Sequence, residues 1–312
     1  MNAESPGLNA SIIVATLNRA GSLKRLLMSL DSMEIPDAMQ VEAVIVDNGS
    51  TDETSSLLRN EQVKYRKFSL KVLQERQRGK ARAVNLGLRH AQGRLILFVD
   101  DDVVVDRAWL TGHCECHVKS PFDAVQGRVL PGVDPEGRLA VAGLVREYNI
   151  PIIDYGDEIR EIRGSTGTNM SLKRAVFEKI GYFDVRLGPG AAGFSEDTEY
   201  SMRIRKAGFK IGYAPHAIVH HELNADRYGT TYNRMAQYRK GLSRSIYRRD
   251  SIVLNVLPNL FANCVRWALY RLLGRRRKAY KTEGRIVKYW GYLVGRLLLV
   301  MGKESRIQIV KR

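Results

Sequence analysis

The feature that most constrains the fold of this chain is a regular alternation of apolar runs and helix-periodic segments over its first hundred residues. Apolar runs stand at residues 11–16, 41–46, 70–73 and 95–99. The segment after the first run carries leucines at helical spacing, and further helices are expected from about Thr54 and over Lys80–His90. Strands that are buried on both faces and separated by helices form right-handed βαβ units. The pattern therefore predicts an α/β fold with a mostly parallel central sheet flanked by helices.

Acidic clusters follow two of these predicted strands. The second apolar run leads directly into Asp47–Asp52, and the fourth leads into Asp100–Asp102. In open α/β sheets, ligands bind beyond the carboxyl ends of the strands, and neighbouring carboxylates repel one another unless a cation compensates them. A divalent cation such as Mg²⁺ or Mn²⁺ prefers oxygen ligands and bridges diphosphate oxygens. We therefore expect a metal-assisted phosphate site at this edge of the sheet.

Simpler interpretations of the two clusters remain open. Asp47–Asp52 has the composition of a polar turn with a helix cap, and Asp100–Asp102 could form a solvated loop. Their position at strand ends of one sheet favours a functional interpretation. The first predicted strand is followed by neither a P-loop motif nor a dinucleotide-binding glycine motif, so phosphate must be bound by metal and basic side chains.

The segment His113–His117 also contains residue types that bind metals. His113 and His117 would share one face of a helix, whereas Cys114 and Cys116 would point away from that face. No second ligand pair follows at zinc-site spacing, so we do not predict a metal site here. The chain has three cysteines, too few to staple a fold of this size, and this suits a reducing, cytoplasmic setting.

The chain carries a series of short motifs in a fixed order. They are Ala15–Arg19, Val46–Asp52, Gly79–Gly87, Phe98–Asp102, Gly164–Met170, Gly181–Asp184, Ser195–Glu199 and Ala217–His220. In order and spacing the series resembles family 2 of the inverting glycosyltransferases, which have the GT-A fold. The resemblance covers about Ser11 to His221. It departs from the family at Asn48, where many relatives have a second aspartate.

The resemblance implies a role for individual residues. The residues expected to bind the nucleotide-sugar donor are Thr16, Asn18, Asp47, Lys80, Asp100 and Asp101. Asp102 and His220 would bind the divalent metal, Mg²⁺ or Mn²⁺, and Asp197 would be the general base. Without the resemblance, Asp197 could equally be a first-turn acid of a helix, and His220 an ordinary strand-end residue.

The activity that follows is transfer of a hexosyl or deoxyhexosyl group from a nucleotide sugar, with inversion. The departing diphosphate needs a metal to neutralise its charge, and the acceptor hydroxyl needs a base. The expected acceptor is a membrane-associated saccharide or a lipid-linked glycan, as in polysaccharide biosynthesis at the cell envelope. The alternatives are a nucleotidyltransferase that makes sugar nucleotides and, with less support, a nucleic-acid-binding protein.

The net positive charge of the chain is confined to its C-terminal tail. Residues 226–312 hold 21 Lys and Arg against 4 Asp and Glu, whereas residues 1–225 hold 29 of each. Such a tail suits a polyanion. Its uncharged segment Ser251–Val265, its apolar segment Tyr289–Met301 and the basic run Arg275–Lys278 favour an anionic membrane surface over nucleic acid.

The expected location is the cytoplasmic side of the membrane, as a peripheral, monotopic protein. Neither apolar segment is expected to span a bilayer, and Met1–Ala10 does not resemble a signal peptide. A helical lid with a solvated basic face is the simpler alternative for the tail. The predicted organisation is a nucleotide-sugar-binding half at 1–106, an acceptor-binding and catalytic half at 107–225, and a basic amphipathic helical tail at 226–312.

Overall fold

The computed structural model describes residues 10–62, 67–132, 152–222 and 230–307, and divides into two compact units. The first unit takes in residues 1–184 and 197–224, and the second takes in 185–196 and 225–312. The predicted division at residue 106 falls inside the first unit and stays a prediction. The predicted start of the tail, at residue 226, lies outside the described residues.

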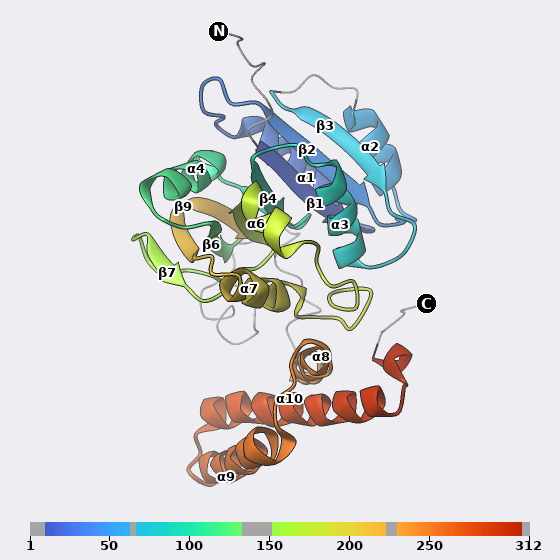
Figure 1. Ribbon diagram of the computed structural model, residues 1–312, viewed down its shortest axis with the longest axis vertical. Coiled ribbons are helices and arrows are strands. Elements are labelled where there is room, and N and C mark those ends of the chain that lie inside the picture. Colours follow the sequence, from blue (N-terminus) through green and yellow to red (C-terminus); the bar gives the residue numbers. More distant parts are fainter. Residues whose placement is uncertain (1–9, 63–66, 133–151, 223–229, 308–312) are drawn as a thin grey trace. The chain divides into compact units, whose positions relative to one another are not determined.

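The first unit opens with the predicted strand–helix alternation (Figure 1). Its first elements are β1 (Ala10–Thr16), α1 (Ala20–Ser32), β2 (Val41–Asp47), α2 (Thr54–Gln62), β3 (Ser69–Gln74), α3 (Lys80–His90) and β4 (Leu95–Val99). These four strands lie in the order β3-β2-β1-β4, and all their pairings are parallel. The predicted α/β fold is confirmed. One detail differs: β3 is the edge strand of the sheet, so none of its residues is fully buried.

The remaining elements of the unit extend the same sheet. They are β5 (Val103–Val105), α4 (Trp109–Lys119), β6 (Ala124–Pro131), β7 (Arg160–Ile162), β8 (Asn169–Lys173), α6 (Arg174–Ile180), α7 (Glu196–Lys206) and β9 (Ile211–His221). The sheet order continues β4-β8-β6-β9-β5, with β8 antiparallel to both of its neighbours. β4 therefore lies in the interior of the sheet, with β1 on one side and β8 on the other.

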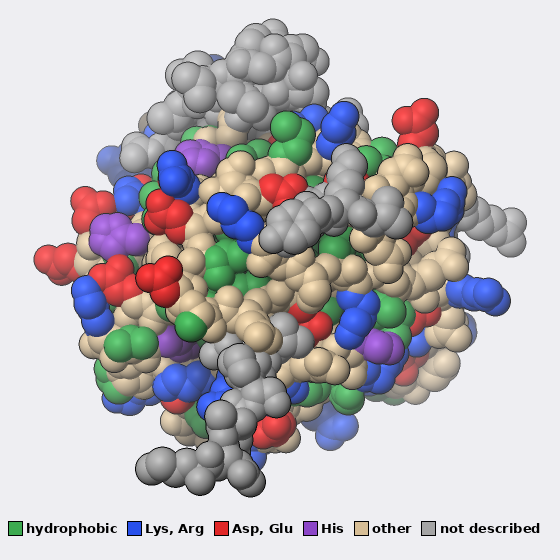
Figure 2. Space-filling model, turned by 90° about the horizontal axis from the view of Figure 1, so that it is seen from above, with side chains coloured by type: hydrophobic (Ala, Val, Ile, Leu, Met, Phe, Trp, Pro, Cys, Tyr) green, Lys and Arg blue, Asp and Glu red, His purple; other side chains and the backbone are tan. Residues whose placement is uncertain are grey.

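The two faces of the sheet bury different helices because successive side chains of a strand point to opposite faces. Ile12 and Val14 of β1 pack in a cluster with the four buried leucines of α1 and with Trp109 of α4. Ile13, between them, packs in a second cluster with α3, α6 and α7. Burial of apolar area stabilises the fold by roughly 25 cal/mol per Å², so both layers contribute to the stability of the unit. The face drawn in Figure 2 has acidic and basic side chains interspersed.

The second unit consists of helices and the segment 185–196. Its helices are α8 (Thr230–Tyr247), the π-helical turn η2 (Ile252–Val256), α9 (Leu257–Leu272), α10 (Arg276–Val300) and the 3-10 turn η3 (Glu304–Arg306). Pro258, predicted to kink a helix, lies in the first turn of α9, where its missing N–H costs no intrahelical hydrogen bond. α10 packs against both α8 and α9.

Small residues allow α8 and α10 to approach closely. A Cβ at Gly241 would collide with the backbone of Lys288, and a Cβ at Gly291 would collide with the backbone of Tyr238. Gly295 lies in the same way against Ser245. The three glycines therefore fix how the two helices pack, because any larger residue would push them apart.

Much of the apolar surface of the second unit is exposed. Among the residues that the structure describes, one segment is long and apolar enough to cross a membrane by length and composition, Ile252–Leu272, with a mean hydropathy of 1.3. The apolar segment expected to end at Val265 thus continues as helix to Leu272. This length differs from the expectation of no full span, and only 11% of its apolar window is buried in the protein.

Candidate active site

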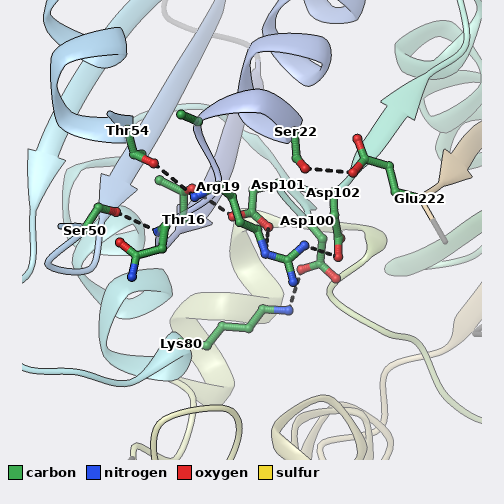
Figure 3. A network of polar contacts seen from close by, with 12 residues as sticks. Thr16, Arg19, Ser22, Ser50, Thr54, Lys80, Asp100, Asp101, Asp102 and Glu222 are labelled. Atoms are coloured by element: carbon green, nitrogen blue, oxygen red, sulfur yellow. Dashed lines mark hydrogen bonds and ion pairs between the residues drawn. The ribbon is translucent and has the colours of Figure 1, made fainter. Parts of the chain in front are cut away.

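An acidic triplet, Asp100–Asp102, follows the carboxyl end of the interior strand β4. The parallel strands β1 and β2 end on the same side of the sheet. Thr16 and Asp47 are paired in register as the last residues of β1 and β2, and Thr16 contacts the triplet through Asp101. Asp101 and Asp102 are 8% and 7% exposed. The sheet thus gathers residues far apart in sequence around three neighbouring carboxylates, as Figure 3 shows.

Asp100 is held by a cation and a hydroxyl. Its Oδ1 accepts a hydrogen bond from Nζ of Lys80, the first residue of α3. Its Oδ2 accepts a hydrogen bond of 2.8 Å from Oγ1 of Thr168. Burial by itself raises the pKa of Asp100, but the Lys80 ammonium and the two hydrogen bonds outweigh burial and lower this pKa to about 2. Asp100 is therefore a carboxylate at neutral pH.

Asp101 points toward β1. Its Oδ2 accepts a hydrogen bond of 2.8 Å from Oγ1 of Thr16, and its Oδ1 lies 3.7 Å from Nε of Arg19. Burial raises the pKa of Asp101 to about 7, and the charges of Asp102 and Asp100 act in the same direction against the guanidinium. Burial and the two neighbouring carboxylates thus destabilise the ionised form of Asp101.

Asp102 lies between an arginine and a histidine. Its Oδ2 accepts a hydrogen bond of 2.5 Å from Nη1 of Arg19, and its Oδ1 lies 3.5 Å from Nε2 of His221. Asp100, Asp102 and His221 each offer a ligand atom, and these atoms lie within 4.8 Å of one another. Two carboxylates and one imidazole at this separation could hold a divalent metal ion.

The histidine of this cluster differs from the one expected. His220 was predicted as the metal ligand, but the structure brings His221 to the triplet. The reason is the alternation of side chains along β9, because adjacent residues of a strand point to opposite faces. His221 is buried at the end of β9 and pairs in register with Val103.

The expected donor-binding residues at the ends of β1 and β2 form one network. Both carboxylate oxygens of Asp47 accept hydrogen bonds, from the N–H of Ser50 at 2.9 Å and from Oγ of Ser55 at 2.5 Å. Asn18, in the left-handed region with a φ of 53°, accepts a hydrogen bond of 2.7 Å from the N–H of Thr51. The loops after the two strands are therefore tied to each other.

Asn48, the position at which the motif series differs from the family that it resembles, connects two loops. Its Nδ2 donates hydrogen bonds to the carbonyl groups of Glu75 and Gln77, and its Oδ1 accepts one of 2.7 Å from the N–H of Gly79. Gly79 has a φ of 144° and directly precedes α3, which begins with Lys80. An aspartate could not donate these two bonds, so the asparagine stabilises the loop that positions Lys80.

Asp197 lies in the first turn of α7, close to the triplet. Burial raises its pKa, with Asp100 acting in the same direction and the Lys80 ammonium opposing both. A backbone hydrogen bond from Gly167 also reaches Asp197. A Cβ at Gly167 would lie 3.2 Å from Oδ1 of Asp197, so a side chain at this position would crowd the carboxylate. The predicted base and the predicted donor site are thus neighbours.

Three residues of this network had no role assigned from the sequence, namely Arg19, Thr168 and Glu222. Arg19 and Thr168 belong to the motifs Ala15–Arg19 and Gly164–Met170, which was the available signal. Glu222 follows β9, accepts from Ser22 at 2.7 Å, and donates its backbone N–H to the carbonyl group of Asp102 at 2.8 Å. That contact links residues 120 positions apart, and no local pattern indicates it.

Within the His113–His117 segment of α4, His113 and Cys116 are buried. Nε2 of His113 donates to Oδ1 of Asn169 at 2.9 Å, and its Nδ1 lies 2.9 Å from Oγ of Ser171. Nε2 of His117 lies 2.9 Å from the same hydroxyl. Burial lowers the pKa of His113 to about 3 and that of His117 to about 4. Both imidazoles are therefore neutral and engaged in hydrogen bonds within the core.

A sheet of this order, with an acidic triplet at the end of its fourth strand, defines the GT-A class of fold. The chain belongs to glycosyl transferase family 2, whose family model matches residues 11–181. Among solved structures, it is similar to the mannosyltransferase PcManGT from Pyrobaculum calidifontis in complex with GDP-Man and Mn²⁺. That likeness has a TM-score of 0.61 at 20% identity and covers 95% of this chain and 89% of the other.

Two curated relatives are similar in sequence. The glycosyltransferase AglE of Haloferax volcanii is 24% identical over 204 residues, which are 65% of this chain and 64% of AglE. The poly-beta-1,6-N-acetyl-D-glucosamine synthase of Staphylococcus epidermidis is 25% identical over 223 residues, 67% of this chain and 48% of the synthase. The matches thus span about half to two thirds of these relatives.

Proposed function

We propose that the protein transfers a sugar from a nucleotide-sugar donor to a saccharide or lipid-linked acceptor at a membrane surface, with inversion and with a divalent metal. The observation that carries the proposal is the grouping of Asp100, Asp102 and His221, with ligand atoms within 4.8 Å of one another. Membership of glycosyl transferase family 2 supports it. The Mn²⁺ and GDP-Man bound by PcManGT, which shares the fold, point in the same direction.

The three candidate metal ligands suit a hard divalent cation. Two carboxylates and one imidazole suit Mn²⁺ and Mg²⁺. Softer metals prefer thiolate ligands, and this group of three residues has none. When bound, such an ion would neutralise the charge that develops on the departing diphosphate. Asp100 and Asp102 would hold it with His221. The Lys80 ammonium and the Arg19 guanidinium, both now paired with these carboxylates, would then be available to diphosphate oxygens.

The chain supplies two further functions in this scheme. Thr16, Asn18 and Asp47 would orient the nucleoside, because the loops after β1 and β2 are tied together by hydrogen bonds. Asp197 would accept the proton of the attacking hydroxyl as the new C–O bond forms and the bond from the anomeric carbon to the diphosphate breaks. Its raised pKa brings a carboxyl closer to the pH at which a base is most effective.

The membrane association is part of the same proposal. Large apolar side chains are exposed on η2 and α9, including Phe261 at 72% and Leu272 at 84%. A crossing orientation would place Asn255, Asn259 and Arg266 in hydrocarbon, which is costly for amide and guanidinium groups. We therefore infer an interfacial position on the cytoplasmic side, with α9 lying along the surface. Release by high salt with carbonate is expected, and full resistance to it would contradict this position.

Product analysis tests the reaction against the alternative. With a nucleotide sugar, Mn²⁺ and a saccharide acceptor, a glycosyltransferase releases nucleoside diphosphate, whereas a nucleotidyltransferase releases pyrophosphate from a nucleoside triphosphate and a sugar phosphate. Asp102→Asn should abolish most metal-dependent donor binding, measured by thermal shift, while the fold is retained. Asp106→Asn, outside the triplet, is the matched control. Unchanged metal-dependent binding in Asp102→Asn would refute the site.

A further inference from the structure

A cavity of about 270 Å³ lies in the second unit between α8, α9 and α10. Four cationic side chains line it, namely Arg244 of α8, Arg266 of α9, and Arg285 and Lys288 of α10. The other lining residues are asparagines and tyrosines, which offer hydrogen bonds. Among the described residues that line the cavity there is no carboxylate. This composition is unlike a core cavity, which is apolar, and unlike a surface ion-pair network, which has charges of both signs.

The cations of the cavity are largely uncompensated. Arg244 forms an ion pair of 2.6 Å with Asp250. Within the described ranges, no carboxylate lies in ion-pair distance of Arg266, Arg285 or Lys288. Burial lowers the pKa of Lys288, and nearby positive charges including Arg244 lower it further. Three cations around one cavity repel one another, so an anion bound between them would be stabilised by all three.

Asn263 adds a second requirement for the ligand. It is 4% exposed and lines the cavity. Its Nδ2 donates a hydrogen bond of 2.6 Å to the carbonyl group of Asn259, whereas its buried Oδ1 has no hydrogen-bond partner. A buried acceptor without a donor costs about 1–3 kcal/mol. The ligand that suits the cavity therefore combines an anionic group with a hydrogen-bond donor such as a hydroxyl.

The surface next to the cavity is apolar. Asn259, Asn263 and Arg266 form one side of α9 and line the cavity. Leu269, three residues after Arg266 and so on a neighbouring part of the helix surface, is exposed. Phe261, Leu254 and Leu272 of the same segment are exposed as well. A ligand that satisfies both surfaces is amphiphilic, with an anionic polar head and apolar chains.

We propose that this cavity binds the phosphate headgroup of a membrane lipid. The guanidinium groups of Arg266 and Arg285 bind phosphate oxygens, the Lys288 ammonium adds a third contact, and Oδ1 of Asn263 accepts from a headgroup hydroxyl. The acyl chains lie along the exposed face of α9. The proposal rests on the membrane association proposed above, but not on the transfer reaction, because every residue in it belongs to the helical unit.

The first experiment separates a phosphate site from general attraction to negative surfaces. The full chain is sedimented with vesicles containing phosphatidylglycerol, and with vesicles brought to the same surface charge by a fatty acid carboxylate. The expected result is about tenfold tighter binding to the phosphate vesicles, in keeping with charge-assisted hydrogen bonds. Equal binding to both would overturn the proposal, because attraction to the surface alone depends on charge and not on its chemistry.

Variants locate that preference in the molecule. Arg285→Gln with Lys288→Gln should abolish the preference for phosphate vesicles. Arg276→Gln with Arg277→Gln, the same change of charge on exposed residues of α10 outside the cavity, should weaken binding to both vesicles equally and keep the preference. Because Lys288 lies among cations, its neutralisation should leave the melting temperature equal or higher, so the variant remains folded. A preference that survives in Arg285→Gln with Lys288→Gln would overturn the proposal.

A third arm distinguishes the lipid from a soluble phosphate ester. Glycerol 1-phosphate, which carries the same phosphate and hydroxyl without acyl chains, is added to the phosphatidylglycerol assay. We expect weak competition at millimolar concentration, absent in Arg285→Gln with Lys288→Gln. If micromolar glycerol 1-phosphate displaced the protein fully, the site would be one for a soluble ester, and the lipid assignment would be wrong. Donor binding at the triplet, measured in parallel, reports on the proposed transferase function independently.

Discussion

Nη1 of Arg19 donates a hydrogen bond of 2.5 Å to Oδ2 of Asp102, the same carboxylate whose Oδ1 lies 3.5 Å from Nε2 of His221. The guanidinium therefore compensates the triplet where a metal ion is proposed to bind. Both cations would use the carboxylate of Asp102, so they compete for it. In the donor complex, this competition would direct Arg19 toward the diphosphate.

Arg19→Gln should therefore bind Mn²⁺ more tightly than the wild-type protein when no donor is present. The expected gain is roughly fivefold, which corresponds to about 1 kcal/mol for a partly exposed ion pair. Titration of free Mn²⁺ by electron paramagnetic resonance measures it directly. Arg25→Gln is the control, because Arg25 pairs with Glu222 at 2.7 Å and contacts none of the triplet. Weaker Mn²⁺ binding in Arg19→Gln would show that the guanidinium does not compete.

The two late histidines should behave differently. His221→Ala should weaken Mn²⁺ binding by roughly tenfold or more, because it removes one of three ligand groups. His220→Ala should leave Mn²⁺ binding nearly unchanged, because its side chain points to the other face of β9. The same titration measures both variants. The reverse order of effects would restore His220 as the ligand.

Asp197→Asn should separate chemistry from donor binding. Loss of the proton acceptor should lower kcat by about two to four powers of ten, with donor affinity little changed. Burial raises the pKa of Asp197, so kcat of the wild-type enzyme should fall as the pH drops through a value above the ordinary 3.8. Asp197→Asn should lack this acid limb in its residual rate. Glu199→Gln, which breaks only a 2.7 Å pair with Arg203, should keep it.

Acid should destabilise the first unit through His113. Its folded pKa of about 3 lies below the ordinary 6.5, so the unfolded chain binds the proton first and stability falls as the pH drops below 6.5. The slope should approach about 1.4 kcal/mol per pH unit for this one group. Urea unfolding at pH 7, 6 and 5 should show a shallower slope for His113→Asn. His216→Asn, at an exposed residue of β9, should retain the wild-type slope.

The predicted residues of the site differ in how far local sequence could locate them. Thr16, Asp47 and the triplet could be placed because each ends or directly follows an apolar run, and parallel strands end at one edge of a sheet. Glu222 could not, because it reaches Asp102 only through the pairing of β9 with β5. Arg19 belongs to the motif Ala15–Arg19, so the sequence marked it as a residue of the site. Its contact with Asp102 spans 83 residues and depends on where α1 begins, which no local pattern gives.

The sequence by itself determined the strands and helices of the first hundred residues, because side-chain periodicity decides which face of each element is buried. It also determined the family, through motifs whose order survives at low identity, and the confinement of net positive charge to the tail. Only the tertiary structure placed His221, rather than His220, beside Asp100 and Asp102, since adjacent residues of a strand point to opposite faces. It alone formed the cationic cavity, because Arg244, Arg266 and Lys288 stand on three helices whose close packing depends on glycines in α8 and α10.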